Sequence, residues 1–159
     1  SGTIAAGYKS IYEKINIAKP NTKVTTPITS TINALKNLKI NKLSIFTPYT
    51  DEINQSVIKY FKEENIEISE LSYFDIASDI DIGKVDSDYL YDVLSKQDLS
   101  KSDALFVSCT ALPVLSIIKD VEKKLGKIVL SSNQTLIWET LNQIDYKKKI
   151  EGYGELFKN

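Results

Sequence analysis

Apolar positions recur along this chain with two spacings, one typical of buried strands and one typical of helices. Short, mainly apolar runs predict strands at residues 23–26, 42–47, 66–73, 103–107 and 127–130. Between them apolar residues return every three or four positions, as Ile53, Val57 and Phe61 do, which predicts amphipathic helices. Helices are expected at residues 4–17, 29–38, 51–64, 110–125 and 134–144, with another through Leu90, Val93 and Leu94. Such alternation predicts an α/β fold with parallel sheets flanked by helices.

Polar residues and glycines mark the ends of these elements. Asp86 or Ser87 is expected to cap the helix through Leu90, and Gly126 stands where a left-handed C-cap is needed. Trp138 follows the helical spacing of its segment and is expected in the core. A polar loop is predicted after residue 73 and through Asp79.

The chain also partly repeats itself. Residues 23–38 overlay a later segment so that Thr25-Thr26 match Ser131-Ser132, and the two segments have the same apolar phase. The apolar positions that correspond are Ile32, Leu35 and Leu38 in one copy and Trp138, Leu141 and Ile144 in the other. The overlay indicates either two related lobes, the first one incomplete, or only the general likeness of any two helix–strand–helix units.

Length and composition describe an ordinary globular domain. The chain has 159 residues, is 42% apolar and 26% charged, and has a net charge of −1. Nothing in this balance favours nucleic acid as a partner, and no apolar run approaches a membrane span. One cysteine excludes an internal disulfide and is typical of a reducing, cytoplasmic setting.

Two missing residue types restrict the chemistry further. There is no His, so a His-based triad cannot be built, and one Cys without His cannot make a structural zinc site. Arg is absent as well, which removes bidentate clamps on a carboxylate. An anionic ligand must therefore be held by backbone N–H groups, hydroxyls or Lys.

Cys109 is the strongest candidate for chemistry. It follows the predicted strand at 103–107, and the helix predicted from Thr110 would direct the positive end of its dipole at the thiol and favour thiolate. The alternative is a small buried apolar residue, since free Cys is among the most buried residue types.

Several segments taken together resemble the aspartate/glutamate racemase superfamily, and within it the maleate cis-trans isomerase family. The matching segments are Ser1-Gly2-Thr3, Val24-Thr25-Thr26, Thr47 to Asn54, Ser108 to Leu112, and Gly126-Lys127 with Ser131 to Gln134. The resemblance implies two pseudo-symmetric α/β lobes with the active site between them, no cofactor and no metal. It divides the chain into 1–40 (the remainder of an incomplete first lobe), 41–131 (the second lobe) and 132–159 (a helix and tail returning to the first).

The resemblance also implies roles for individual residues. Cys109 would be the catalytic thiol, and Tyr49 a hydroxyl that binds a carboxylate and assists proton transfer. Substrate would be bound by Ser1 and Thr110 through backbone N–H groups, and by Thr25 and Ser131 from the paired-hydroxyl turns. Members of the isomerase family have an Asn in the middle loop, whereas residues 77–81 here offer Asp79 and Asp81, which disfavour a dicarboxylate.

These features predict a cofactor-independent isomerase of a small (di)carboxylate. An amino-acid racemase, an arylmalonate-type decarboxylase and a non-catalytic carboxylate-binding fragment remain alternatives. An N-terminal segment of the same protein with a second cysteine is expected to complete the site. A homodimer is the family expectation.

Overall fold

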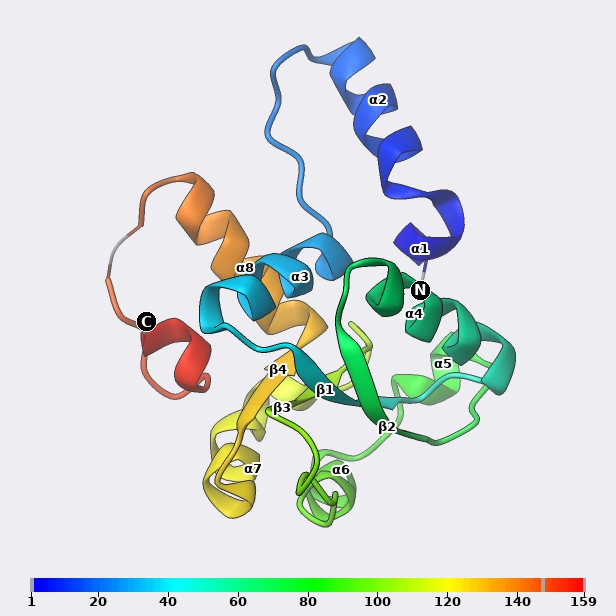
Figure 1. The fold of residues 1–159 in the computed structure, drawn as a ribbon, viewed down its shortest axis with the longest axis vertical. Coiled ribbons are helices and arrows are strands. Elements are labelled where there is room, and N and C mark those ends of the chain that lie inside the picture. Colours follow the sequence, from blue (N-terminus) through cyan, green and yellow to red (C-terminus); the bar gives the residue numbers. More distant parts are fainter. Residues whose placement is uncertain (1, 147, 159) are drawn as a thin grey trace.

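The computed structural model describes residues 2–146 and 148–158, and its centre is one parallel β-sheet. The strands are β1 (Lys42–Thr47), β2 (Glu67–Tyr73), β3 (Ala104–Val107) and β4 (Ile128–Ser131). Their order across the sheet is β2-β1-β3-β4, with every neighbouring pair parallel (Figure 1). The predicted α/β class with a parallel sheet is thereby confirmed.

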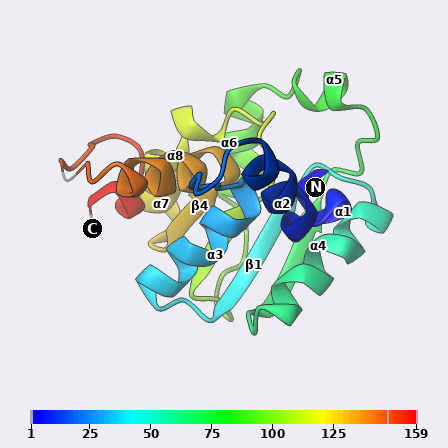
Figure 2. The same ribbon diagram turned by 90° about the horizontal axis from the view of Figure 1, so that it is seen from above.

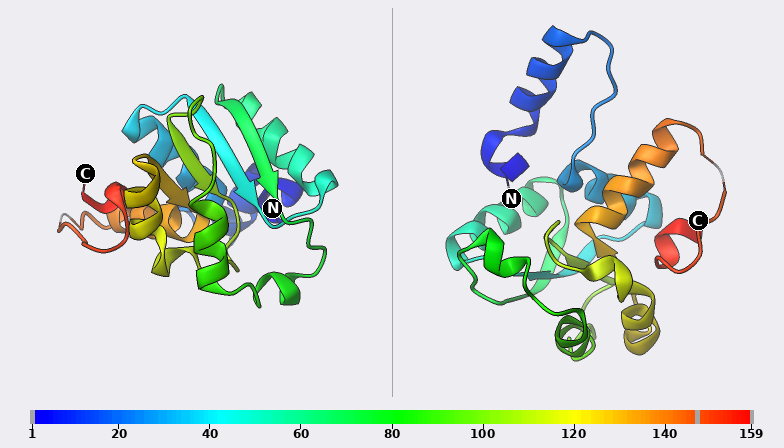
Figure 3. Two further views of the ribbon diagram at one scale, coloured as in Figure 1. Left: turned by 90° about the horizontal axis from the view of Figure 1, so that it is seen from below. Right: turned by 180° about the vertical axis from the view of Figure 1, so that it is seen from behind.

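Helices cover both faces of the sheet, which explains why β1, β3 and β4 are buried at nearly every position, whereas the edge strand β2 is only partly buried. Leu43, Ile45 and Phe106 pack toward α3 (Pro27–Leu38), α4 (Asp51–Glu63) and α8 (Ser132–Gln143), on what we call the first face. Phe46, Leu105 and Val129 point to the second face, where α6 (Ser87–Leu94) and α7 (Ile118–Leu125) lie. Figure 2 shows the first face from above, and Figure 3 (left) shows the second face from below.

The two central strands send their helices to opposite faces. β1 leads into α4 on the first face, whereas β3 leads through a loop into α7 on the second face. In open α/β sheets the crevice beyond the carboxyl ends of two such strands is the usual ligand site. The topology therefore directs attention to the residues that follow Thr47 and Val107.

The N-terminal region differs from the single helix predicted at 4–17. Two helices, α1 (Gly2–Ala6) and α2 (Tyr8–Ala18), are separated by Gly7, whose φ of 76° ends the first helix. α2 contains no buried residue and stands away from the sheet (Figures 1 and 3). Helix periodicity could not reveal this break, because Gly7 interrupts the backbone without changing the apolar spacing.

The strand predicted at 23–26 does not form. Residues 22–26 are extended chain without a partner strand, and a strand needs a neighbour for its backbone hydrogen bonds. Thr26 instead caps α3: its hydroxyl accepts from the Thr29 N–H, just as Ser131 accepts from Gln134 at the start of α8. The caps thus place Thr26 opposite Ser131, one residue away from the overlay that paired Thr25 with Ser131.

Most other predicted ends agree with the structure. Asp86 caps α6, Gly126 ends α7 in the left-handed region with φ 63°, and Trp138 is buried in the core. Two short helices were not predicted, α5 (Asp79–Ile82) and η2 (Glu155–Lys158), and η1 (Val114–Ser116) forms a separate short helix within the range predicted at 110–125. Leu156 and Phe157 of η2 are buried on the first face, so the C-terminal segment belongs to the core.

Within the described residues no helix is long and apolar enough to cross a membrane.

Candidate active site

Cys109 lies just beyond the carboxyl end of β3, at the centre of the sheet. The ladder between β1 and β3 continues to Ser108, whose N–H donates to the Phe46 carbonyl at 2.9 Å. Cys109 is only 5% exposed, and its Sγ accepts a hydrogen bond from the Ala111 N–H at 3.3 Å. The sulfur thus faces a backbone donor at a fixed position in the crevice.

The helix predicted from Thr110 is not present. Residues 110–112 form bends, η1 follows at Val114, and α7 begins only at Ile118. Pro113 accounts for the delay, because a proline disfavours helical backbone at the preceding residue and has no N–H of its own. The argument that this helix directs its dipole at Cys109 was therefore wrong.

Two other helices begin at the crevice instead. Ser132 in the first turn of α8 and Pro27 and Ile28 in the first turn of α3 line the same pocket as Cys109. The Asn133 side chain joins α8 to the loop after the thiol, donating to the Thr110 carbonyl at 3.0 Å. A helix N-terminus favours negative charge and offers free N–H groups. The positive dipole end that the sequence assigned to a helix starting at Thr110 is therefore provided at this pocket by α8.

Tyr49 follows β1 and is held by a buried asparagine. Asn54, fully buried in α4, donates to the Tyr49 carbonyl at 3.2 Å and accepts from the Thr47 hydroxyl at 2.5 Å. The Thr47 hydroxyl in turn accepts from the Tyr49 N–H at 3.2 Å. Thr50 occupies the N-cap position of α4 but makes no side-chain cap.

Sequence reasoning gave no role to Asn54. A signal was available, because Asn54 is a polar residue on the otherwise apolar face that includes Val57 and Phe61. Its amide forms the link between α4 and the loop that presents Tyr49.

These elements surround one pocket of about 360 Å³. The described residues that line it come from six parts of the chain: Gly2, Thr3, Ile4, Pro27, Ile28, Tyr49, Asp79, Ser108, Cys109, Thr110, Ala111 and Ser132. The structure thus brings Cys109, Tyr49 and Thr110 together around one pocket.

Two other candidates do not line the pocket. Thr25 bonds to the Ser30 hydroxyl at 2.7 Å, and Ser131 is 1% exposed and caps α8, so neither lines the pocket. Both hydroxyls are engaged at helix starts, which is the common use of such residues. Ser1 lies outside the described residues, although Gly2 and Thr3 beside it line the pocket.

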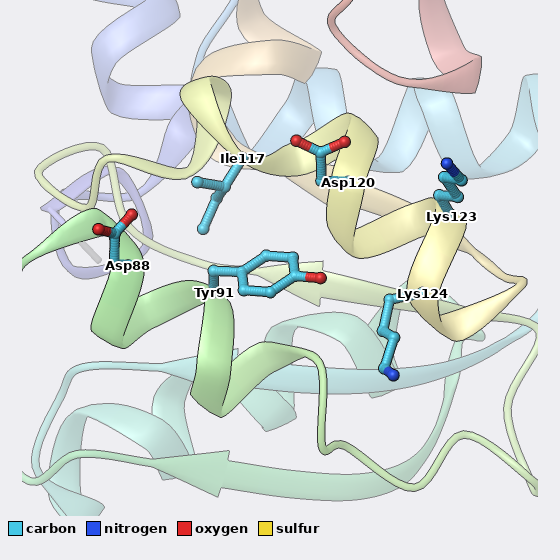
Figure 4. A pocket seen from close by; sticks show the side chains of 6 residues that line it. All are labelled: Asp88, Tyr91, Ile117, Asp120, Lys123 and Lys124. Atoms are coloured by element: carbon cyan, nitrogen blue, oxygen red, sulfur yellow. The ribbon is translucent and has the colours of Figure 1, made fainter.

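Other concave surfaces lack comparable chemistry. A pocket of about 490 Å³ between α6 and α7 is lined by Asp88, Tyr91, Ile117, Asp120, Lys123 and Lys124 (Figure 4). In that view Tyr91 lies between the two helices, Asp88 and Asp120 lie on either side of Ile117, and the two lysines lie farther along α7. No thiol is present there, and no group of three or more acidic, Cys or His side chains suited to a metal occurs among the described residues.

The fold and the site define a class: an α/β protein with a buried thiol and a tyrosine at the switch point of a parallel sheet. The model of the arylmalonate decarboxylase family matches residues 9–157, and the chain belongs to that family. The resemblance to the aspartate/glutamate racemase superfamily, with maleate isomerases and arylmalonate decarboxylases as relatives, is confirmed.

Individual relatives agree with the family. The chain is 26% identical over 126 residues to the maleate isomerase of Geobacillus stearothermophilus, covering 79% of this chain and 50% of that protein. It is 28% identical over 136 residues to the arylmalonate decarboxylase of Bordetella bronchiseptica, covering 84% of this chain and 57% of that protein. The chain spans about half the length of the curated relatives it matches.

Solved structures show the same fold. A Cys-to-Ser variant of the Nocardia farcinica maleate cis-trans isomerase with a covalently bound succinylcysteine intermediate superposes with a TM-score of 0.86 at 21% identity. That superposition covers 94% of this chain and 61% of the isomerase. Unliganded arylmalonate decarboxylase gives a TM-score of 0.74 at 27% identity, covering 83% of this chain and 59% of that chain.

Proposed function

We propose that this chain provides the thiol-bearing part of a cofactor-independent isomerase site for a small carboxylate, of the maleate isomerase type. The main support is the pocket that gathers Cys109, Tyr49 and the first turn of α8 at the carboxyl ends of β1 and β3. The named activity of the maleate isomerases and the succinylcysteine in the N. farcinica structure favour the same chemistry.

In this proposal the ligand carboxylate binds at the start of α8 and near the Thr110–Ala111 backbone, where N–H groups and the helix dipole favour an anion. This arrangement suits a chain without Arg, because it needs no cationic side chain. The longer relatives have further chain, and we propose that an N-terminal segment of the whole protein completes the pocket beside α1.

The proposed reaction begins when the Cys109 thiolate uses a Sγ electron pair to form a C–S bond to one alkene carbon. The π electrons move to the other alkene carbon, which takes a proton from an acid, for which Tyr49 is the described candidate. The C–C bond is then single and rotates. Removal of the same proton re-forms the double bond, and the C–S electron pair returns to sulfur as the trans isomer leaves. No electrons are gained or lost overall.

Decarboxylation is the second candidate, since the family model and the B. bronchiseptica enzyme both point to it. There a thiol would deliver a proton to the carbon that loses carbon dioxide. The two reactions are separated by substrate, because only isomerisation requires an alkene.

The test is intact-mass spectrometry of the protein after incubation with maleate. Cys109 is the only thiol, so a gain of one maleate in the native chain and none in Cys109→Ser is the expected result. The serine variant retains all 20 basic residues and therefore also controls for addition to lysine. Its thermal midpoint is measured in parallel to verify folding. An equal gain in both proteins, or no gain in the folded native chain, would overturn the proposed chemistry.

A further inference from the structure

The pocket around Cys109 has an uneven charge. Asp79 is the single Asp, Glu or Lys among its described lining residues, and the others are small, apolar or hydroxyl-bearing apart from the thiol and Tyr49. None of the chain's lysines lines it within the described part. The described walls thus present one negative side chain and no positive one.

Asp79 is held in place by a short, anchored helix. It begins α5, in which the Ser78 hydroxyl accepts from the Asp81 N–H, and the Gly83 N–H donates to the Asp79 carbonyl at 3.1 Å. Ile82 on the same turn is 1% exposed and packs on the second face of the sheet. Ile82 therefore anchors to the core the turn that carries the exposed Asp79.

The Asp79 carboxylate is also unpaired. No hydrogen bond or ion pair to its side chain is found within residues 2–146 and 148–158, whereas Asp81 on the same turn pairs with Lys84 at 2.8 Å. An unneutralised carboxylate at a pocket wall repels a ligand's anionic group and attracts a donor or a cation.

We propose that Asp79 makes this pocket select a monoanionic carboxylate with a hydrogen-bond donor at its far end, in preference to a dicarboxylate. The inference rests on the proposed function and specifies its substrate class. The ligand carboxylate lies at the start of α8, and the donor faces Asp79. A ligand without a second carboxylate avoids repulsion by the Asp79 carboxylate. With both groups partly solvated, the loss of this one repulsive pair changes the preference by about tenfold, or about 1.4 kcal/mol.

The test compares two ligands of nearly equal shape, maleate and its monoamide maleamate. The rate of adduct formation on Cys109 is measured by intact mass for both ligands, and each rate is divided by the rate with a small free thiol. This division removes the intrinsic difference in reactivity. The native chain is expected to prefer maleamate about tenfold.

Two matched variants locate the origin of the preference. Asp79→Asn removes the charge with little change of shape. This variant is expected to react with the two ligands at about equal corrected rates. Asp81→Asn makes the same change on the same turn, at a carboxylate that is paired and does not line the pocket, and is expected to keep the native preference. A native preference for maleate, or the same preference in Asp79→Asn, would refute the role of Asp79 while leaving the thiol chemistry intact. No adduct with either ligand in any variant would refute both proposals.

Discussion

Gly154 lies where the C-terminal segment approaches the body most closely, and replacing it with alanine is the most informative change to stability. The residue is buried, has a φ of 89°, and follows Tyr153, whose carbonyl accepts from Gln134 Nε2 at 2.6 Å. A Cβ on Gly154 would lie 2.7 Å from Gln134 Nε2 and 3.2 Å from both carboxylate oxygens of Glu122. Such a contact forces the Gln134 side chain to move.

The expected loss has two parts. Placing a side chain at this positive φ costs about 1 kcal/mol. Displacing Gln134 weakens its hydrogen bond to Tyr153 and the bond that it accepts from the Ser131 N–H, which are worth about 1 kcal/mol each. Gly154→Ala should therefore lower the free energy of unfolding by about 2–3 kcal/mol.

Gly152→Ala is the matched control. Gly152 has a φ of 93°, nearly that of Gly154, but nothing lies within 4 Å of its added Cβ. It should lose only the backbone part, about 1 kcal/mol. Urea unfolding followed by the fluorescence of the single Trp provides both values, and the slope m should stay constant. Equal midpoints for the two variants would refute the assignment of Gly154 as a point of steric contact.

Two further changes test the groups that hold the core elements around the site. Burial raises the pKa of Glu122, although the Val129 and Glu155 N–H groups that its carboxylate accepts from act in the opposite direction. The folded pKa therefore exceeds the unfolded value, so this part of the stability is present below about pH 4.3 and is lost as pH rises through the raised pKa. When the free energy of unfolding is measured in urea between pH 4 and 8, the Glu122→Gln variant should not show this decline. The variant Glu63→Gln, at an exposed carboxylate, should have the same pH dependence as the native chain. The same pH dependence in Glu122→Gln and the native chain would contradict the prediction. Asn54→Ala leaves the Thr47 hydroxyl and the Tyr49 carbonyl without their partner and should cost about 2–4 kcal/mol in the same assay. Exposed Asn33→Ala should cost less than about 0.5 kcal/mol, and a similar loss in both Asn variants would show that the buried amide has no special role.

The sequence predicted most of the sheet well because β1, β3 and β4 are buried on both faces. Runs such as Ala104–Val107 are apolar at successive positions, which only a strand covered on both sides requires. The end of β3 fixed the place of Cys109, and the end of β1 fixed that of Tyr49, so the pairing of these strands brought the two together without further information.

The errors arose where backbone geometry, not apolar spacing, decides the outcome. Apolar residues between Ala111 and Leu125 have helical spacing, yet Pro113 and η1 delay the helix to Ile118. The residues at 23–26 have the composition of a strand but no strand beside them. Spacing is a local property, whereas a strand partner or a helix start depends on the rest of the molecule.

Gln134 shows how the distant parts of the chain act on one site. Its Nε2 binds the C-terminal segment at Tyr153, and its Oε1 accepts from the Ser131 N–H at the start of α8. Of the two residues after that cap, Ser132 lines the pocket and Asn133 donates to the Thr110 carbonyl. The Asn133 bond joins α8 to the loop after Cys109, and the Gln134 bond joins α8 to the C-terminal segment, in which Leu156 and Phe157 are buried. Through α8 the C-terminal segment is therefore linked to the loop that follows the thiol, although none of its described residues lines the pocket.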